Sequence, residues 1–545
     1  MGKVFVIGVD GGTLELIERW KDDLPNFRRL MEGGVYGRME STLPPVTCPA
    51  WNGLFTGKNP GKMGIFTHWA LPIDKDKNAK LANYSLQDSP SIWDILGDSG
   101  KKVGIVNVPT TYPPKKVNGF MVSDWFEIAF YPGIDYTYPA EFRQKLEKLG
   151  YQVHPLVDLT IPRKEKVYIK RFGKLINQQV NTIKRLITEE PWDFFVYVFN
   201  PTDGAQHYMW HHLDETHPWH DKKRSPQFRD GIKTVYRMVD RAIGELAAAM
   251  PSDTTVFIVS DHGAQASHGL FFTNEWLREN GLLVLKGTEK KAGLVGGFIS
   301  WSVRTTLRFF GPDMVDFLRK IARKLPAAII NRLFNAIMLE GEGDLIQRID
   351  WSKTKAYSVG MAGGILINAR DGDPHGIVPP EEYEALRDRI AGMLLDLKGP
   401  GGENLHTRVI KKENAYSGKY TSVAPDLMFS LDDYHFTQRA NLSAGKIWSE
   451  PPTSGWHSMY GTFMACGPDI KNGVKLSDVS IYDFAPTVLH LLGLPVPSDA
   501  DGRVLVEIFK PGSEPAQRKV NKQAAYASKT AVRGKIEELK NTRRL

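Results

Sequence analysis

The chain has 545 residues, which is too long for one small core and indicates one large domain with insertions or two to three domains. An apolar fraction of 42%, a charged fraction of 24% and 11% aromatic residues are typical of a folded globular protein and exclude a largely disordered one. The two Cys give no disulfide framework, and the net charge of +8, much of it in the C-terminal tail, favours anionic partners such as phosphates.

The sequence contains no evident membrane or targeting segment. The apolar run over residues 4–9 is too short for the core of a signal peptide, and no stretch of about 18 uncharged apolar residues exists. We therefore expect no transmembrane segment, a cytoplasmic location and no specific nucleic-acid partner.

The first predicted element is a buried central strand over residues 3–9, which ends in Asp10-Gly11-Gly12. An acid at the carboxyl end of such a strand lies where open α/β sheets bind ligands. A dinucleotide-binding loop fits poorly because the spacing is not G-x-G-x-x-G. A phosphate loop of the sugar-kinase type fits better but needs a second glycine turn, which we do not find. The third interpretation is that Asp10 binds a metal ion.

A helix is predicted over residues 14–34, and a proline-rich turn with Thr47 follows it. A second helix is predicted to begin near residues 51–55, which places Thr47 close to a helix N-terminus. The simplest interpretation of such a Thr is an N-cap. The alternative is a nucleophile, which requires a base or a metal ion to remove its proton.

Two later strands also end in potential metal ligands. The strand predicted over residues 193–199 precedes Asp203 and His207, whose spacing of four puts both on one face of a helical turn. The strand predicted over residues 254–259 ends at Asp261-His262. Further predicted elements are a strand over 101–108 and helices over 165–190 and 228–249.

The remaining chain suggests a helical insertion over residues 285–348, either a cap or lipid-contacting surface or simply helices packed on the core. Strand character returns at 350–368, a helix is predicted at 381–397, and a strand at 462–467 follows His457. A short helix is predicted at 481–493. We assign 1–284 and 349–510 to one catalytic domain and 511–545 to a basic tail, helical or disordered.

Taken together, these motifs resemble the alkaline phosphatase superfamily, and within it the type I phosphodiesterase/nucleotide pyrophosphatase family. The matching motifs, in chain order, are Val-Asp-Gly at 9–11, Pro-Pro-Val-Thr at 44–47, Thr-Gly-Lys-Asn-Pro-Gly at 56–61, Thr-Asp-Gly-x-x-His at 202–207, Ser-Asp-His-Gly at 260–263 and His457.

The resemblance implies a three-layer α/β/α sandwich with a mostly parallel central sheet, and a hydrolase acting on a phosphodiester or pyrophosphate. It implies two divalent ions, most often Zn²⁺ with Mn²⁺ as an alternative. One ion would be held by Asp203, His207 and His457. The other would be held by Asp10, Asp261, His262 and Thr47. Thr47 would attack phosphorus and form a phospho-Thr intermediate.

The chain departs from the family at one position. Nucleotide-specific members carry Asn 21 residues after the nucleophile, where this sequence has His68, a candidate substrate contact together with His268. The sulfatase relatives need a C-x-P-x-R motif that is absent, and the mutase relatives generally use Ser. Two alternatives remain: phosphoryl transfer to a lipid or glycan alcohol, and a non-catalytic protein that binds a phosphate ligand.

Overall fold

The computed structural model describes the larger part of the chain, namely residues 2–73, 75, 80–124, 128, 134–153, 164–286, 342–362, 364–370, 375–443 and 445–524. The predicted insertion over 285–348 falls mostly outside these residues, and so does the tail from residue 525. In the part of the chain that is described, no helix combines the length and apolarity needed to cross a bilayer.

The core of the protein is a ten-stranded sheet with the order β18-β2-β17-β7-β1-β6-β3-β4-β5, and β19 also pairs with β2. Five neighbouring strands at its centre, from β7 to β4, run parallel, whereas β17 and β5 are antiparallel to their neighbours. The strand bounds are β1 Val4–Val9, β2 Val35–Glu40, β3 Val103–Pro109, β4 Gly119–Asp124, β5 Thr137–Tyr138, β6 Phe194–Phe199, β7 Thr255–Val259, β17 Tyr460–Cys466, β18 Val474–Lys475 and β19 Val479–Ser480.

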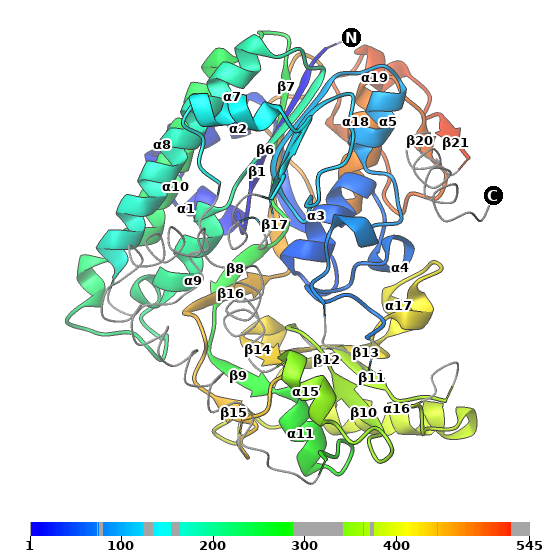
Figure 1. Ribbon diagram of the computed structural model, residues 1–545. Helices are drawn as coiled ribbons and strands as arrows, with labels where there is room; N and C mark the ends of the chain where they lie inside the picture. The colour runs from blue at the N-terminus through cyan, green and yellow to red at the C-terminus, as the bar shows by residue number, and fades with distance from the viewer. Residues whose placement is uncertain are drawn as a thin grey trace.

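Helices cover both faces of this sheet (Figure 1). The alternation along β1 explains the layers, because Phe5 and Ile7 belong to one apolar cluster and Val4 and Val6 to another. The first cluster includes α2 Pro25–Gly33, α8 Glu165–Glu189 and α10 Gly231–Ala249; the second includes α3 Thr47–Thr56, α5 Ile92–Asp98 and α18 Phe484–Leu491. The predicted α/β sandwich is confirmed.

A second sheet of seven strands has its own apolar core and lies beyond one end of the main sheet (Figure 1). Its order is β10-β11-β13-β14-β9-β15, with β12 beside β13. Its elements are β9 Gly269–Phe272, α11 Thr273–Glu279, α15 Glu342–Arg348, β10 Ala356–Ser358, β11 Gly364–Ile367, α16 Pro380–Leu395, β12 Thr407–Lys411, β13 Leu427–Leu431, β14 Phe436–Arg439 and β15 Trp448–Ser449. The sequence did not predict this sheet, and the assignment to domains stays a prediction.

Two local predictions need correction. The single helix predicted over 14–34 is α1 Leu14–Arg19, a short 3₁₀ turn at Lys21–Asp23 and then α2. The break lies between Arg19 and Pro25, which begins α2; Pro25 has no amide proton and restricts the residue before it, Leu24. The predicted tail over 511–545 is also not wholly helical or disordered. Its residues Lys522–Gln523 form β21, which pairs in parallel with β20 Val496–Pro497.

Candidate active site

Adjacent parallel strands place the predicted ligands at one edge of the main sheet. Asp10 follows β1, Asp261 follows β7, and α9 Pro201–Leu213 begins directly after β6. The register pairs β1 with both β6 and β7, so the carboxyl ends of these three strands lie side by side. His457 arrives from the distant β16 Gly455–Ser458, which pairs with β8 Gly263–Ala266 so that His457 faces Ala264.

The first group of ligands is Asp203, His207 and His457. Asp203 Oδ1 lies 3.2 Å from His207 Nε2 and 3.8 Å from His457 Nε2, and the two Nε2 atoms are 3.3 Å apart. Three donor atoms at these separations can surround one ion with bonds of about 2 Å. The structure therefore brings together the set predicted for one metal ion.

The second group centres on His262. Its Nε2 lies 3.1 Å from Asp261 Oδ2, 3.8 Å from Asp10 Oδ1 and 3.4 Å from Thr47 Oγ1. The His262 ring also stacks on His457 with centroids 3.7 Å apart. His262 thus adjoins both groups. One of its ring nitrogens lies within 4.8 Å of a ligand atom of Asp203 and of His457, and one lies within 4.8 Å of a carboxylate oxygen of Asp10 and of Asp261.

The carboxylates of this site lack the hydrogen-bond donors that buried anions need. Asp10 Oδ1, Asp203 Oδ1 and Asp261 Oδ2 are buried and accept no hydrogen bond. A buried carboxylate oxygen without a donor is costly unless a cation neutralises it. The donor set of three imidazoles and three carboxylates is one that Zn²⁺ and Mn²⁺ accept. The residues present therefore fit divalent cations.

The histidines are held in the orientation that a metal ligand requires. The Nδ1 atoms of His207, His457 and His262 lie 2.8, 2.9 and 3.0 Å from backbone carbonyl oxygens. An Nδ1–H that donates to a carbonyl leaves Nε2 as the free lone pair, pointing into the cluster. Asp10 is anchored in the same way, because its Oδ2 accepts a hydrogen bond of 3.2 Å from Trp51 Nε1.

The pKa shifts of the buried carboxyl groups agree with a site for a cation. Burial, together with the neighbouring carboxylates of Asp261 and Asp203, raises the pKa of Asp10 well above its usual range. Burial also raises the pKa of Asp203, but the adjacent imidazoles of His207 and His457 outweigh it and lower that pKa. The repulsion between neighbouring carboxylates contributes to the raised pKa of Asp10, and a cation between them would relieve it.

Thr47 is the first residue of α3, and the N-cap position belongs to Val46. No side chain caps this helix end, so the N-cap interpretation of Thr47 is wrong. Its hydroxyl lies beside His262 instead. The positive end of the helix dipole favours negative charge at this position. The prediction that Thr47 lies near a helix N-terminus is confirmed.

The two predicted substrate contacts lie in different surroundings. His68 is buried, and burial together with the nearby charge of His262 lowers its pKa to about 4, which places it beside the cluster. His268 stacks on His435 with ring centroids 4.6 Å apart, and no contact described for it reaches the seven ligands. A substrate role for either residue stays a prediction. Trp51 was missed, although it lies four residues after Thr47 on the same helix.

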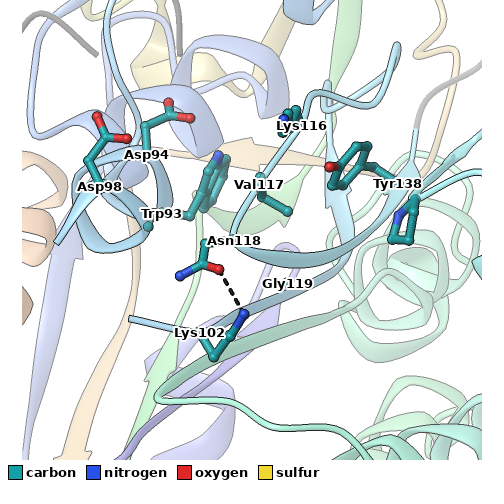
Figure 2. A pocket seen from close by; sticks show the side chains of 11 residues that line it. Trp93, Asp94, Asp98, Lys102, Lys116, Val117, Asn118, Gly119 and Tyr138 are labelled. Atoms are coloured by element: carbon teal, nitrogen blue, oxygen red, sulfur yellow. Dashed lines mark hydrogen bonds between the residues drawn. The ribbon is translucent and has the colours of Figure 1, made fainter. Parts of the chain in front are cut away.

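A pocket of about 390 Å³ lies away from this cluster. Lys102, Asn118 and Gly119 line it, at the start of β3 and β4 and hence at the opposite ends of the parallel strands from Asp10 (Figure 2). Lys102 Nζ donates to Asn118 Oδ1 at 2.9 Å. None of the predicted site residues lines this pocket.

Comparison with known proteins establishes the family. The chain belongs to the type I phosphodiesterase/nucleotide pyrophosphatase family, whose model matches residues 4–459. The prediction of a hydrolase acting on phosphoester bonds is thereby confirmed. A search of curated proteins found no significant match.

Solved structures share the fold. Murine ectonucleotide pyrophosphatase/phosphodiesterase 5 is similar with a TM-score of 0.52 and 13% identity, covering 93% of this chain and 100% of that chain. An inactive Thr-to-Ala variant of that murine protein, in complex with AMP, gives a TM-score of 0.51 and 13% identity over 94% of this chain and 100% of that one. At this identity the likeness establishes the fold.

Proposed function

We propose that the protein hydrolyses a phosphodiester or pyrophosphate at a two-metal site, with Thr47 as the nucleophile. The observation that carries this proposal is the set of three buried carboxylate oxygens without donors, in a cluster whose His262 lies 3.4 Å from the Thr47 hydroxyl at the start of α3. The residues that would hold the two ions are Asp10, Thr47, Asp203, His207, Asp261, His262 and His457.

The chain supplies positioning and the nucleophile. Bound divalent ions would provide Lewis acidity at the attacking and leaving oxygens and ease deprotonation of a hydroxyl. Thr47 gives up its hydroxyl proton, and its oxygen forms a bond to phosphorus while the bond to the leaving oxygen breaks. The leaving group takes up a proton and departs as the first product, which leaves a phospho-Thr47 ester. Water then cleaves this ester, which regenerates Thr47 and releases the second product. Trp51 keeps Asp10 oriented through both steps.

The substrate is a small phosphoester. The AMP complex of the murine relative supports nucleotides as the first class to test. His68, which stands 21 residues after Thr47, is proposed to contact a phosphoryl oxygen of the substrate. We propose Zn²⁺ as the metal, because it accepts both the imidazoles and the carboxylates of the cluster.

The test compares two threonines of one helix. Thr47→Ala should lower kcat/KM for an aryl phosphodiester by roughly 10³-fold or more, because it removes the nucleophile. Thr56→Ala is the matched control, since Thr56 lies at the other end of α3 and its hydroxyl bonds to Asn52 O at 2.8 Å. It should retain activity.

A labelled substrate tests the intermediate directly. Rapid acid quenching of wild-type protein with a ³²P-labelled diester should trap label on the peptide that contains Thr47, and Thr47→Ser should retain partial turnover and labelling. If Thr47→Ala hydrolyses the diester as fast as Thr56→Ala, Thr47 is not the nucleophile.

A further inference from the structure

A second group of potential metal ligands lies outside the proposed active site. One donor atom each of Glu165, His211 and His212 lies within 4.8 Å of the other two. Glu165 is the first residue of α8, and both histidines lie in the last turn of α9. His211 follows His207 by one helical turn, a rise of about 6 Å, so this group is adjacent to the active site but separate from it.

The contacts of this group match those of ligated histidines. His212 Nε2 lies 3.2 Å from Glu165 Oε1, the separation expected for two donors on one ion, and His212 Nδ1 lies 3.0 Å from Ser225 Oγ. A hydroxyl that accepts from Nδ1 fixes the ring with its Nε2 lone pair toward Glu165. The His211 ring packs against His212 with centroids 3.8 Å apart.

An ordinary ion pair explains only part of this arrangement. Arg224 Nη2 binds Glu165 Oε2, and its Nε lies 3.4 Å from Oε1, so Arg224 and His212 together would satisfy the carboxylate. They leave His211 unexplained, because its Nδ1 is buried and has no hydrogen-bond partner. A buried ring nitrogen without a partner is costly in an ion-pair network and is expected beside a metal site.

The protonation states are those of metal ligands. Burial raises the pKa of Glu165, but the contacts of its carboxylate with His212 and Arg224 outweigh burial and lower the pKa to about 2, so the side chain is a carboxylate. Burial and the neighbouring His212 and His217 lower the pKa of His211 to about 3, so its ring is neutral at pH 7. Metal binding would not have to displace a proton from either group.

We propose that Glu165, His211 and His212 bind a third divalent cation, of the Zn²⁺ type, which fastens the start of α8 to the end of α9. Two imidazole nitrogens and one carboxylate oxygen form a donor set typical of zinc, and Arg224 and Ser225 hold the second atoms of two of these ligands. Because α9 also carries Asp203 and His207, the ion would brace the helix on which the active site depends.

Metal content tests the proposal. Wild-type protein loaded with Zn²⁺ and desalted should hold about three ions per chain by mass spectrometry, and His211→Ala and Glu165→Gln should each hold about one fewer. His406→Ala is the control for adventitious binding to surface histidines, because His406 is exposed and pairs with Asp433. It should match wild type. The difference of one ion is independent of whether the proposed two-metal centre exists.

Crystals of the wild-type protein keep the test decisive if a variant fails to fold. Anomalous diffraction at the zinc edge should show a peak between Glu165, His211 and His212. The proposal is overturned if His211→Ala and Glu165→Gln both bind as much Zn²⁺ as wild type, or if the anomalous map has no peak at this position.

Discussion

Replacing Gly8 with Ala tests how tightly the nucleophile helix is packed against the central strand. Gly8 lies within β1, and a Cβ added there would come 2.7 Å from Trp51 Cη2 and 2.7 Å from Val198 Cγ2. The neighbouring side chains are fully buried, so neither can move into solvent. Trp51 also donates to Asp10, so any shift of its ring reaches the proposed metal site.

The expected cost follows from two opposing terms. Overpacking a buried contact costs about 1–3 kcal/mol. Removing a glycine from a strand returns roughly 0.5–1 kcal/mol of conformational entropy. The net loss for Gly8→Ala is therefore on the order of 0.5–2 kcal/mol. Trp51 lies one turn after Thr47, and a displacement of about 1 Å at a nucleophile can cost roughly 100-fold in rate.

Urea unfolding midpoints and kcat/KM for an aryl phosphodiester measure the two effects. Gly392→Ala is the matched control, because Gly392 lies in α16 with no atom within 4 Å of an added Cβ. That change should stabilise the protein by about 0.5–1 kcal/mol without loss of activity. Adding Val198→Ala to Gly8→Ala should recover part of the lost stability. If Gly8→Ala behaves like Gly392→Ala in both assays, the packing argument is wrong.

Two further predictions concern residues near the proposed metal site. His68 has its folded pKa lowered to about 4 by burial and by His262, whereas an unfolded His titrates near 6.5. The unfolded chain therefore binds more protons between these values, and the stability of chelator-treated protein should fall by up to roughly 3 kcal/mol as pH drops from 6.5 to 4. Urea unfolding midpoints measured between pH 4 and 6.5 should change less with pH in His68→Asn than in the wild-type protein. An equal change with pH in both proteins would show that His68 is not the group responsible. Trp51→Phe removes the donor to Asp10, so we expect roughly 10- to 100-fold weaker Zn²⁺ binding by competitive chelation; unchanged affinity would show that Asp10 needs no such support.

The sequence predicted those parts of the site that a pattern of neighbouring residues in the chain indicates. Asp10, Asp203 and Asp261 each follow an apolar run long enough to read as a buried strand, and neighbouring parallel strands then had to bring them together. Thr47 begins α3, four residues before the predicted start near 51–55, so the local pattern of prolines and aromatic residues predicted the helix but not its first turn. His457 carried no local signal and was predicted as a ligand only because the Asp203–His207 pair needs a third protein ligand.

The rest of the structure depends on pairings that no local pattern encodes. The second sheet joins β9 to β14, which lie more than 160 residues apart, and β10 has only three residues. Such short strands show no clear alternation, so their pairing is decided by tertiary packing. The Trp51–Asp10 hydrogen bond and the Glu165–His212 contact also link distant segments. The dense run of histidines over 207–220 was nevertheless a signal that the sequence interpretation passed over.

The position of β17 determines when the centre of the main sheet can form during synthesis. This strand, built from residues 460–466, fills the gap between β2 and β7, whose residues leave the ribosome much earlier. Until β17 has been synthesised, β2 and β7 each have an edge with unpaired backbone groups, to which strands of other chains can pair. A product that stops before residue 455 would also lack His457. Truncated chains are therefore expected to aggregate rather than to persist as partly active enzyme.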